Sequence, residues 1–259
     1  MEARTALPLD IFLYIIDLLA GGDDEDIKSL QILSLACKSM VPLCRKHLFS
    51  SLCLDSKSIF RRLSELLSIN PDIACYVKNL NYKIRKPISD HELHILDMLK
   101  ERSSLQSIKL SSLGLNWNNL PESIRSSLIS LIELPTIALL DIDSINTFPA
   151  TAFSGCSNLN DLQLRELGLV LPEVNHAISG SHSKIPTPTS LYINGKVYSL
   201  AALLNSASHH AVDPIVDFSR LQIAMFEVEF PGDISLVNEL IKVTTRLEYL
   251  EISTCIHGE

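Results

Sequence analysis

The stretch that decides the fold is Leu105-Gln106-Ser107-Ile108-Lys109-Leu110, with apolar residues at its first, fourth and sixth positions. The alternation at its end is typical of a β-strand with one buried face. The same apolar-x-x-apolar-x-apolar pattern recurs along the chain, in copies that begin at Val77, Ile137, Leu159, Pro188, Phe218 and Leu247. From Val77 onward, successive copies start 28, 32, 22, 29, 30 and 29 residues apart. A period in this range predicts a stacked array of repeats.

Helical patterns fill several of the gaps between the copies. Ser89-Asp90-His91-Glu92 is a capping box ahead of an apolar stripe, and Pro121-Glu122 opens another helix. Strand and helix therefore alternate, which predicts an α/β fold class with parallel strands joined by crossover helices. The chain has 259 residues, 46% of them hydrophobic, so it can bury a sizeable core.

Residues 1–55 predict a different unit, made of three short amphipathic helices. Pro8 suits the first turn of the first helix, and Gly21-Gly22 ends it. This helix is apolar around most of its circumference, more than two short neighbours can cover. We therefore expect part of its surface to contact another chain or the downstream domain. Ile16 and Leu30 are expected in the core of the unit.

Motif spacing in these residues resembles a known family. Leu7-Pro8-Leu9-Asp10-Ile11, Ile15-Ile16, Ala36-Cys37-Lys38 and Leu48-Phe49 are similar to the F-box motif, over roughly residues 7–54. Where that motif carries an aromatic residue after the Cys-Lys pair, this chain has Met40. The repeats resemble leucine-rich repeats of irregular length, and the combination resembles fungal F-box proteins.

The resemblance implies a three-helix F-box (1–55) followed by an irregular leucine-rich-repeat-like α/β solenoid (56–259). The loop position that holds Asn or Cys in regular repeats fits only at Cys255, so we expect an uneven, shallowly curved array. The chain stops directly after a strand, and because solenoids close with a polar cap we expect an incomplete array.

The same resemblance implies a substrate receptor of a cullin-based ubiquitin ligase that docks on a Skp-type adaptor. It implies neither catalysis nor a cofactor. The adaptor contacts carried over from the motif are Leu7, Pro8, Ile11, Ile15, Leu19, Cys37, Lys38 and Met40.

Strand parity predicts where an unknown target protein binds. With the leucine positions pointing inward, alternate residues lie on the open face of the sheet. Nearly all of these are polar or tyrosine, and Tyr and Arg are favoured binding hot spots. Any one polar residue there is explained equally well by solvent exposure, but the surface as a whole is the expected target site. Its residues are Lys109, Asp141, Asp143, Gln163, Arg165, Tyr192, Arg220 and Tyr249.

The composition also limits which partners, compartments and metal sites are expected. A net charge of −8 argues against nucleic-acid binding, which needs a basic footprint. The six cysteines form no C-x-x-C pair, so we expect free thiols in a reducing compartment, the cytoplasm and/or nucleus, and no zinc site. The apolar stretch 7–20 contains Asp10 and Asp17 and is shorter than the roughly 20 residues that span a bilayer, so we do not expect it to cross a membrane.

Two other features have simpler explanations. His209-His210 with Asp213 lacks a fourth metal ligand, and the Ser- and Pro-rich residues 179–190 are expected to form a loop.

The leading alternative to a ligase receptor is a non-catalytic scaffold whose N-terminal helices only cap the repeats. An enzyme has no motif to support it, although a site built from distant residues stays open.

Overall fold

The computed structural model describes residues 8–21, 24–36, 38–171, 185–195, 200–204, 215–228 and 233–254. Its main feature is an open sheet of eight strands, in the order β1-β2-β3-β4-β6-β8-β9-β10, in which all neighbours run parallel. The strands are β1 (Ser51–Leu54), β2 (Asn79–Lys83), β3 (Ser107–Asn116), β4 (Leu139–Asn146), β6 (Asp161–Arg165), β8 (Ser190–Asn194), β9 (Ile223–Val228) and β10 (Tyr249–Thr254). The α/β class predicted from the repeating pattern is confirmed.

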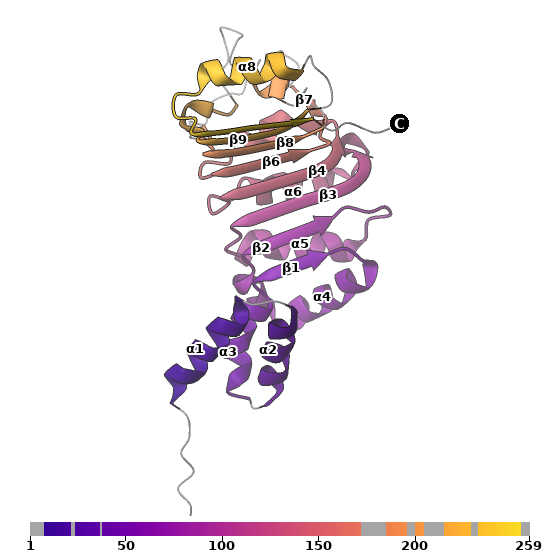
Figure 1. The fold of residues 1–259 in the computed structure, drawn as a ribbon. Coiled ribbons are helices and arrows are strands. Elements are labelled where there is room, and N and C mark those ends of the chain that lie inside the picture. The colour runs from indigo at the N-terminus through magenta and orange to yellow at the C-terminus, as the bar shows by residue number, and fades with distance from the viewer. Residues whose placement is uncertain are drawn as a thin grey trace, which may run out of the picture.

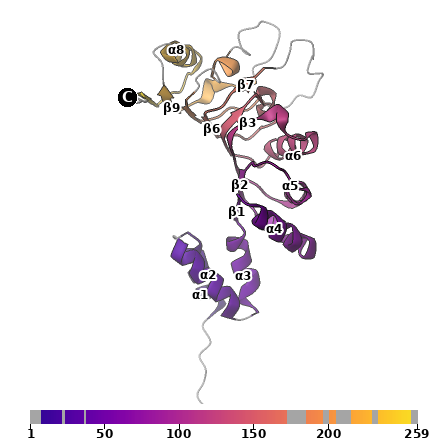
Figure 2. The same ribbon diagram turned by 90° about the vertical axis from the view of Figure 1, so that its right-hand side faces the viewer.

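The connections between the strands are uneven. Helices α4 (Lys57–Ile69), α5 (Asp90–Arg102), α6 (Glu122–Ile132) and α8 (Asp233–Val243) alternate with the 3₁₀ turns η1 (Pro71–Tyr76), η2 (Trp117–Asn119), η3 (Ala150–Phe153) and η4 (Phe218–Arg220). β5 (Phe148–Pro149) and β7 (Leu169–Val170) form a separate small sheet. Figures 1 and 2 show that the sheet curves, with α4, α5 and α6 along its outer side and the opposite face open.

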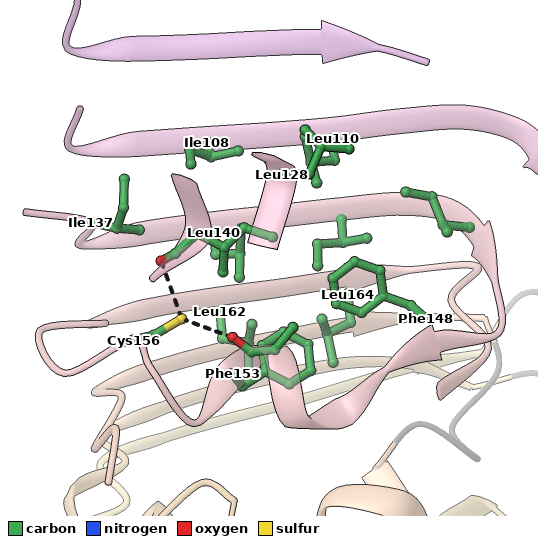
Figure 3. Close-up of a cluster of buried hydrophobic side chains, with 14 of the residues drawn as sticks. Ile108, Leu110, Leu128, Ile137, Leu140, Phe148, Phe153, Cys156, Leu162 and Leu164 are labelled. Atoms are coloured by element: carbon green, nitrogen blue, oxygen red, sulfur yellow. Dashed lines mark hydrogen bonds between the residues drawn. The ribbon is translucent and has the colours of Figure 1, made fainter. Parts of the chain in front are cut away.

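The buried side of the sheet is a ladder of aliphatic side chains. Leu80, Ile108, Leu140, Leu162 and Leu191 lie in register across five neighbouring strands, and each is at most 2% exposed. Figure 3 shows part of this ladder packed against Leu128 of α6 and against Phe148, Phe153 and Cys156. Burying such side chains contributes about 1.5–3 kcal/mol each, so the ladder is the main stabilising element of the sheet.

The copy predicted at residues 218–223 is out of register by three residues. Phe218–Arg220 is the short turn η4, in which the Asp217 side chain accepts a hydrogen bond from the backbone N–H of Ser219. β9 begins at Ile223, which is 40% exposed, while Ala224 and Phe226 fill the ladder positions. The true copy is 221–226. The pattern was misaligned because Ala224 is too small to stand out as a ladder residue.

One strand was missed by the sequence analysis. β1 pairs with β2 in register, Ser51 opposite Asn79, so the sheet begins inside the range 1–55 assigned to the helical unit. Phe49, Leu52 and Leu54 carry the repeat pattern 28 residues before Val77. This copy is hard to recognise in the sequence, because the last two residues of the F-box-like motif, Leu48-Phe49, overlap its start.

Ahead of β1 lie three helices, α1 (Leu9–Ala20), α2 (Asp24–Ala36) and α3 (Met40–Leu48). They have a small core of their own, formed by Ile16, Leu30, Met40 and Cys44, separate from the core under the sheet. Ile16 and Leu30 are fully buried there, as predicted. Figures 1 and 2 place the three helices beyond β1, at the end of the sheet opposite β10.

Candidate interaction surfaces

The first candidate surface is the exposed side of α1. Ile11, Tyr14, Ile15 and Leu18 follow the i, i+3, i+4, i+7 spacing of one helical stripe, and their exposed fractions range from 38% to 65%. The opposite stripe, which includes Phe12 and Ile16, packs into the core of the three helices. α1 is therefore apolar on two sides, as its sequence predicted, and only one side is covered.

The predicted adaptor contacts fall into three groups. Pro8, Ile11, Ile15 and Lys38 are exposed, whereas Leu7 and Cys37 lie outside the described residues. Leu19 is half-buried against the core of the helices, on the covered stripe. Met40 is 8% exposed and is part of that core, and its role as an adaptor contact stays a prediction. Tyr14 and Leu18 lie on the same exposed stripe and were not among the predicted contacts, although the helical spacing from Ile11 indicates them.

A polar contact fixes α1 against α3. The Asp17 carboxylate lies 3.3 Å from Lys46 Nζ and 3.0 Å from His47 Nε2. The His47 contact is close, but Nε2 forms no hydrogen bond in the described structure. Burial, and then the neighbouring Lys46 charge, lower the pKa of His47 from its ordinary value of 6.5, so the ring is neutral at pH 7.

The second candidate surface is the open face of the sheet. At its centre, the Asp141 carboxylate on β4 lies 2.9 Å from Lys109 Nζ on β3 and 3.5 Å from an Arg165 nitrogen on β6. The Asp141 side chain is 7% exposed, while the two cations are about one-third exposed. One buried carboxylate thus holds two cations on adjacent strands.

The network continues across β6 and β8. The Arg165 guanidinium donates to Gln163 Oε1 at 2.9 Å and lies 5.3 Å from the centre of the Tyr192 ring. The Tyr192 hydroxyl in turn donates to Glu227 Oε1 at 2.7 Å. Burial, and then the Glu227 hydrogen bond, raise the pKa of Tyr192, so it remains a neutral donor. The side chains of this face are held in fixed orientations by each other.

Seven of the eight predicted target-face residues lie on strands of the sheet, with the predicted parity. Arg220 is the exception, because it lies in η4 before β9 begins. The corrected register places Ile223, Met225 and Glu227 on the open face of β9 instead. On β10, Tyr249 is 50% exposed and its hydroxyl donates to Glu251 Oε2 at 2.7 Å.

Other kinds of site find little support in the described residues. These residues contain no group of three or more His, Cys, Asp or Glu side chains able to hold a metal ion. None of the helices in this part of the chain is both long and apolar enough to cross a membrane. His209, His210, Asp213 and residues 179–184 of the 179–190 segment lie outside the described residues.

Two surface hollows of about 570 and 410 Å³ lie elsewhere on the molecule. The larger is lined mainly by α6, β5, β7 and the turns near them, and the smaller by the first turns of α4 and α5. Neither is lined by a residue of the predicted target face.

No protein family model and no curated protein matches the chain. The two surfaces are therefore interpreted from their own chemistry.

Proposed function

We propose that this protein is a substrate receptor of a ubiquitin ligase. α1–α3 act as an F-box that docks on a Skp-type adaptor, and through it on a cullin complex, in the cytoplasm or nucleus. The sheet acts as an irregular leucine-rich-repeat-like solenoid whose open face binds a target protein. Such a receptor needs no active site, because it raises the concentration of the target near the enzyme that transfers ubiquitin.

The observation that carries this proposal is the uncovered stripe of α1. Tyr14 is 65% exposed and Leu18 58% exposed, although the opposite stripe already supplies the core of the helices. A contiguous apolar surface of this kind typically marks a protein interface. It lies on the element whose sequence resembles the F-box motif, and at the far end of the sheet from β10 (Figure 1).

Co-purification with a Skp-type adaptor tests the proposal. The wild-type chain is expected to retain the adaptor through gel filtration, and both Leu7→Ser/Pro8→Ala and Tyr14→Asp/Leu18→Asp are expected to lose it. Leu113→Asp is the matched control, since Leu113 is 87% exposed on β3 and its substitution also replaces an exposed apolar side chain by a charge. Failure of the wild type to retain the adaptor, or equal retention by Tyr14→Asp/Leu18→Asp, contradicts the proposal.

A binding scaffold whose helices only cap the sheet is the second candidate. It is favoured by the contact of α3 with η1, the turn that lies between α4 and β2. Deleting residues 1–48 separates the two functions, because it removes α1–α3 and keeps β1. A remainder that unfolds without cooperativity indicates a cap. A folded remainder that has lost only adaptor binding indicates a receptor.

A further inference from the structure

The open face changes character between its centre and its β10 end. At the centre, opposite charges neutralise each other, since Asp141 is paired with Lys109 and Arg165. On β9 and β10, the charged residues of the open face are Glu227 and Glu251, and no Lys or Arg lies on that face of these two described strands. The corrected register creates this contrast, because it removes Arg220 from the face and adds Glu227.

Tyrosine hydroxyls orient both carboxylates at this end. Tyr192 donates to Glu227 and Tyr249 donates to Glu251, each at 2.7 Å. Asn194 Nδ2 also donates to Glu227, at 2.5 Å. Each carboxylate is thus held beside an aromatic ring before any partner arrives, which lowers the entropy cost of binding.

The centre of the face shows what such a combination binds. Arg165 lies over the ring of Tyr192, 5.3 Å from its centre, and within 3.5 Å of the Asp141 carboxylate. A cation is therefore already held there between an aromatic face and a carboxylate, both of which attract it. Tyr249 and Glu251 are the same two components on β10, and none of the ion pairs among the described residues involves Glu251.

Apolar surface lies next to these acids. Tyr249 is opposite Ile223 in the register, and Glu251 is opposite Met225. Ile223 is 40% exposed and Tyr249 50% exposed, whereas Ala224 and Phe226 on the other side of β9 are at most 1% exposed. The patch therefore combines an apolar floor with negative charge, and its complement is an apolar segment that carries positive charge.

We propose that Ile223, Met225, Glu227, Tyr249 and Glu251, here named the β9–β10 patch, bind an arginine or lysine side chain of the target polypeptide. The cation lies against the Tyr249 ring and the Glu251 carboxylate, and a neighbouring apolar side chain of the target covers Ile223. The inference rests on the proposed function only in taking the target to be a protein bound by the open face.

Fluorescence anisotropy with two labelled synthetic peptides tests the proposal on the full chain. The peptides share a leucine- and serine-based frame and differ only in carrying either arginines or glutamates. The wild-type protein is expected to bind the arginine peptide saturably and the glutamate peptide far more weakly. Glu251→Gln and Tyr249→Ala should each weaken binding of the arginine peptide about five-fold, and Tyr249→Phe should weaken it less because it keeps the ring.

Glu101→Gln is the matched control, because Glu101 is an exposed acid on α5, away from the open face. Equal weakening by Glu101→Gln would show that net charge alone attracts the peptide, and would overturn the proposal. So would failure of the arginine peptide to bind, or equal binding of the glutamate peptide. A wild-type dimer that Tyr249→Ala dissociates in sedimentation equilibrium would identify a second copy as the occupant, and would also overturn it.

The adaptor experiment separates this inference from the proposed function. Glu251→Gln is expected to retain a Skp-type adaptor as the wild type does, because β10 and α1 lie at opposite ends of the molecule (Figure 1). Loss of adaptor docking with intact peptide binding refutes the ligase function and leaves the patch standing. Loss of the charge preference with intact adaptor docking refutes the patch alone.

Discussion

At the scale of single residues, Asp141 pairs with two cations at the centre of the open face. Its side chain is 7% exposed and contacts two cations on different strands. Its Oδ1 atom has no hydrogen-bond partner in the described structure. Parity placed Asp141 on this face correctly, but the sequence did not reveal that it is buried. That burial arises because Lys109 and Arg165, distant in the sequence, lie over it on the curved sheet.

Asp141→Asn should therefore destabilise the protein, because it leaves two cations without their counter-ion. Since both cations are about one-third exposed, we expect a loss of about 1–2 kcal/mol in the free energy of unfolding. Urea denaturation measures this loss. Asp143→Asn on the same strand is the control and should change stability by less than about 0.5 kcal/mol. Equal losses would show that the Asp141 ion pairs are not special.

The cysteines differ in reactivity for a local reason. Burial raises the pKa of the Cys156 thiol to about 12, and its Sγ lies 3.5 Å from the carbonyl oxygen of Ile132 (Figure 3). Cys53 and Cys75 are free and exposed. In the native protein at mildly alkaline pH, iodoacetamide should modify Cys53 and Cys75 and leave Cys156 intact, as peptide mass spectrometry would show. Modification of Cys156 at the rate of Cys53 would contradict this.

At the scale of elements, sequence patterns predicted helices and strand register best where the side chains that mark them are large. The stripe Ile11, Tyr14, Ile15 and Leu18 and the capping box at Ser89 are both present in the structure. The register of β9 failed because Ala224 occupies a ladder position with too small a side chain to mark it. The predicted adaptor contacts show a second limit of the sequence. Motif spacing alone does not distinguish an exposed residue such as Ile15 from a buried one such as Met40.

The burial of His47 on α3 predicts a pH dependence of stability. Because the folded state lowers the pKa of His47 below 6.5, the unfolded chain binds this proton first as the pH falls. The free energy of unfolding should therefore decrease as the pH falls from about 6.5 towards the lower pKa of the folded state. Urea unfolding on either side of pH 6.5 measures this slope, and His47→Gln should reduce it. An unchanged slope in His47→Gln would show that other groups cause it.

At the scale of the whole molecule, each strand of the sheet lies next to the strand that follows it within that sheet. This order is why repeats in sequence were enough to predict an α/β sheet, even with connections of unequal length. The curvature of the sheet and the separate core of α1–α3 depend on packing between distant residues, which the pattern alone does not specify. The sequence therefore predicts the α/β class, and the structure adds the curvature of the sheet and the separate core of α1–α3.

The β10 end of the sheet should differ in local stability from its centre. On β10, the ladder positions Leu250 and Ile252 are 39% and 42% exposed, whereas Leu140 and Ile142 of β4 are fully buried. Local opening costs least where few apolar contacts are lost. Hydrogen exchange with mass spectrometry should therefore show backbone amides of β10 exchanging roughly ten-fold or more faster than those of β4. Equal protection would indicate that β10 is covered in solution.

The most direct test of the central claim is a calorimetric titration of the full chain with a purified Skp-type adaptor. Docking through α1 predicts one-to-one binding with a dissociation constant of roughly 1 μM or tighter. It also predicts that Ile11→Asp/Ile15→Asp, which changes exposed side chains only, weakens binding by roughly 100-fold or more while the thermal unfolding of the chain is unchanged. No measurable binding by the wild type, or the same affinity in the variant, would contradict the account.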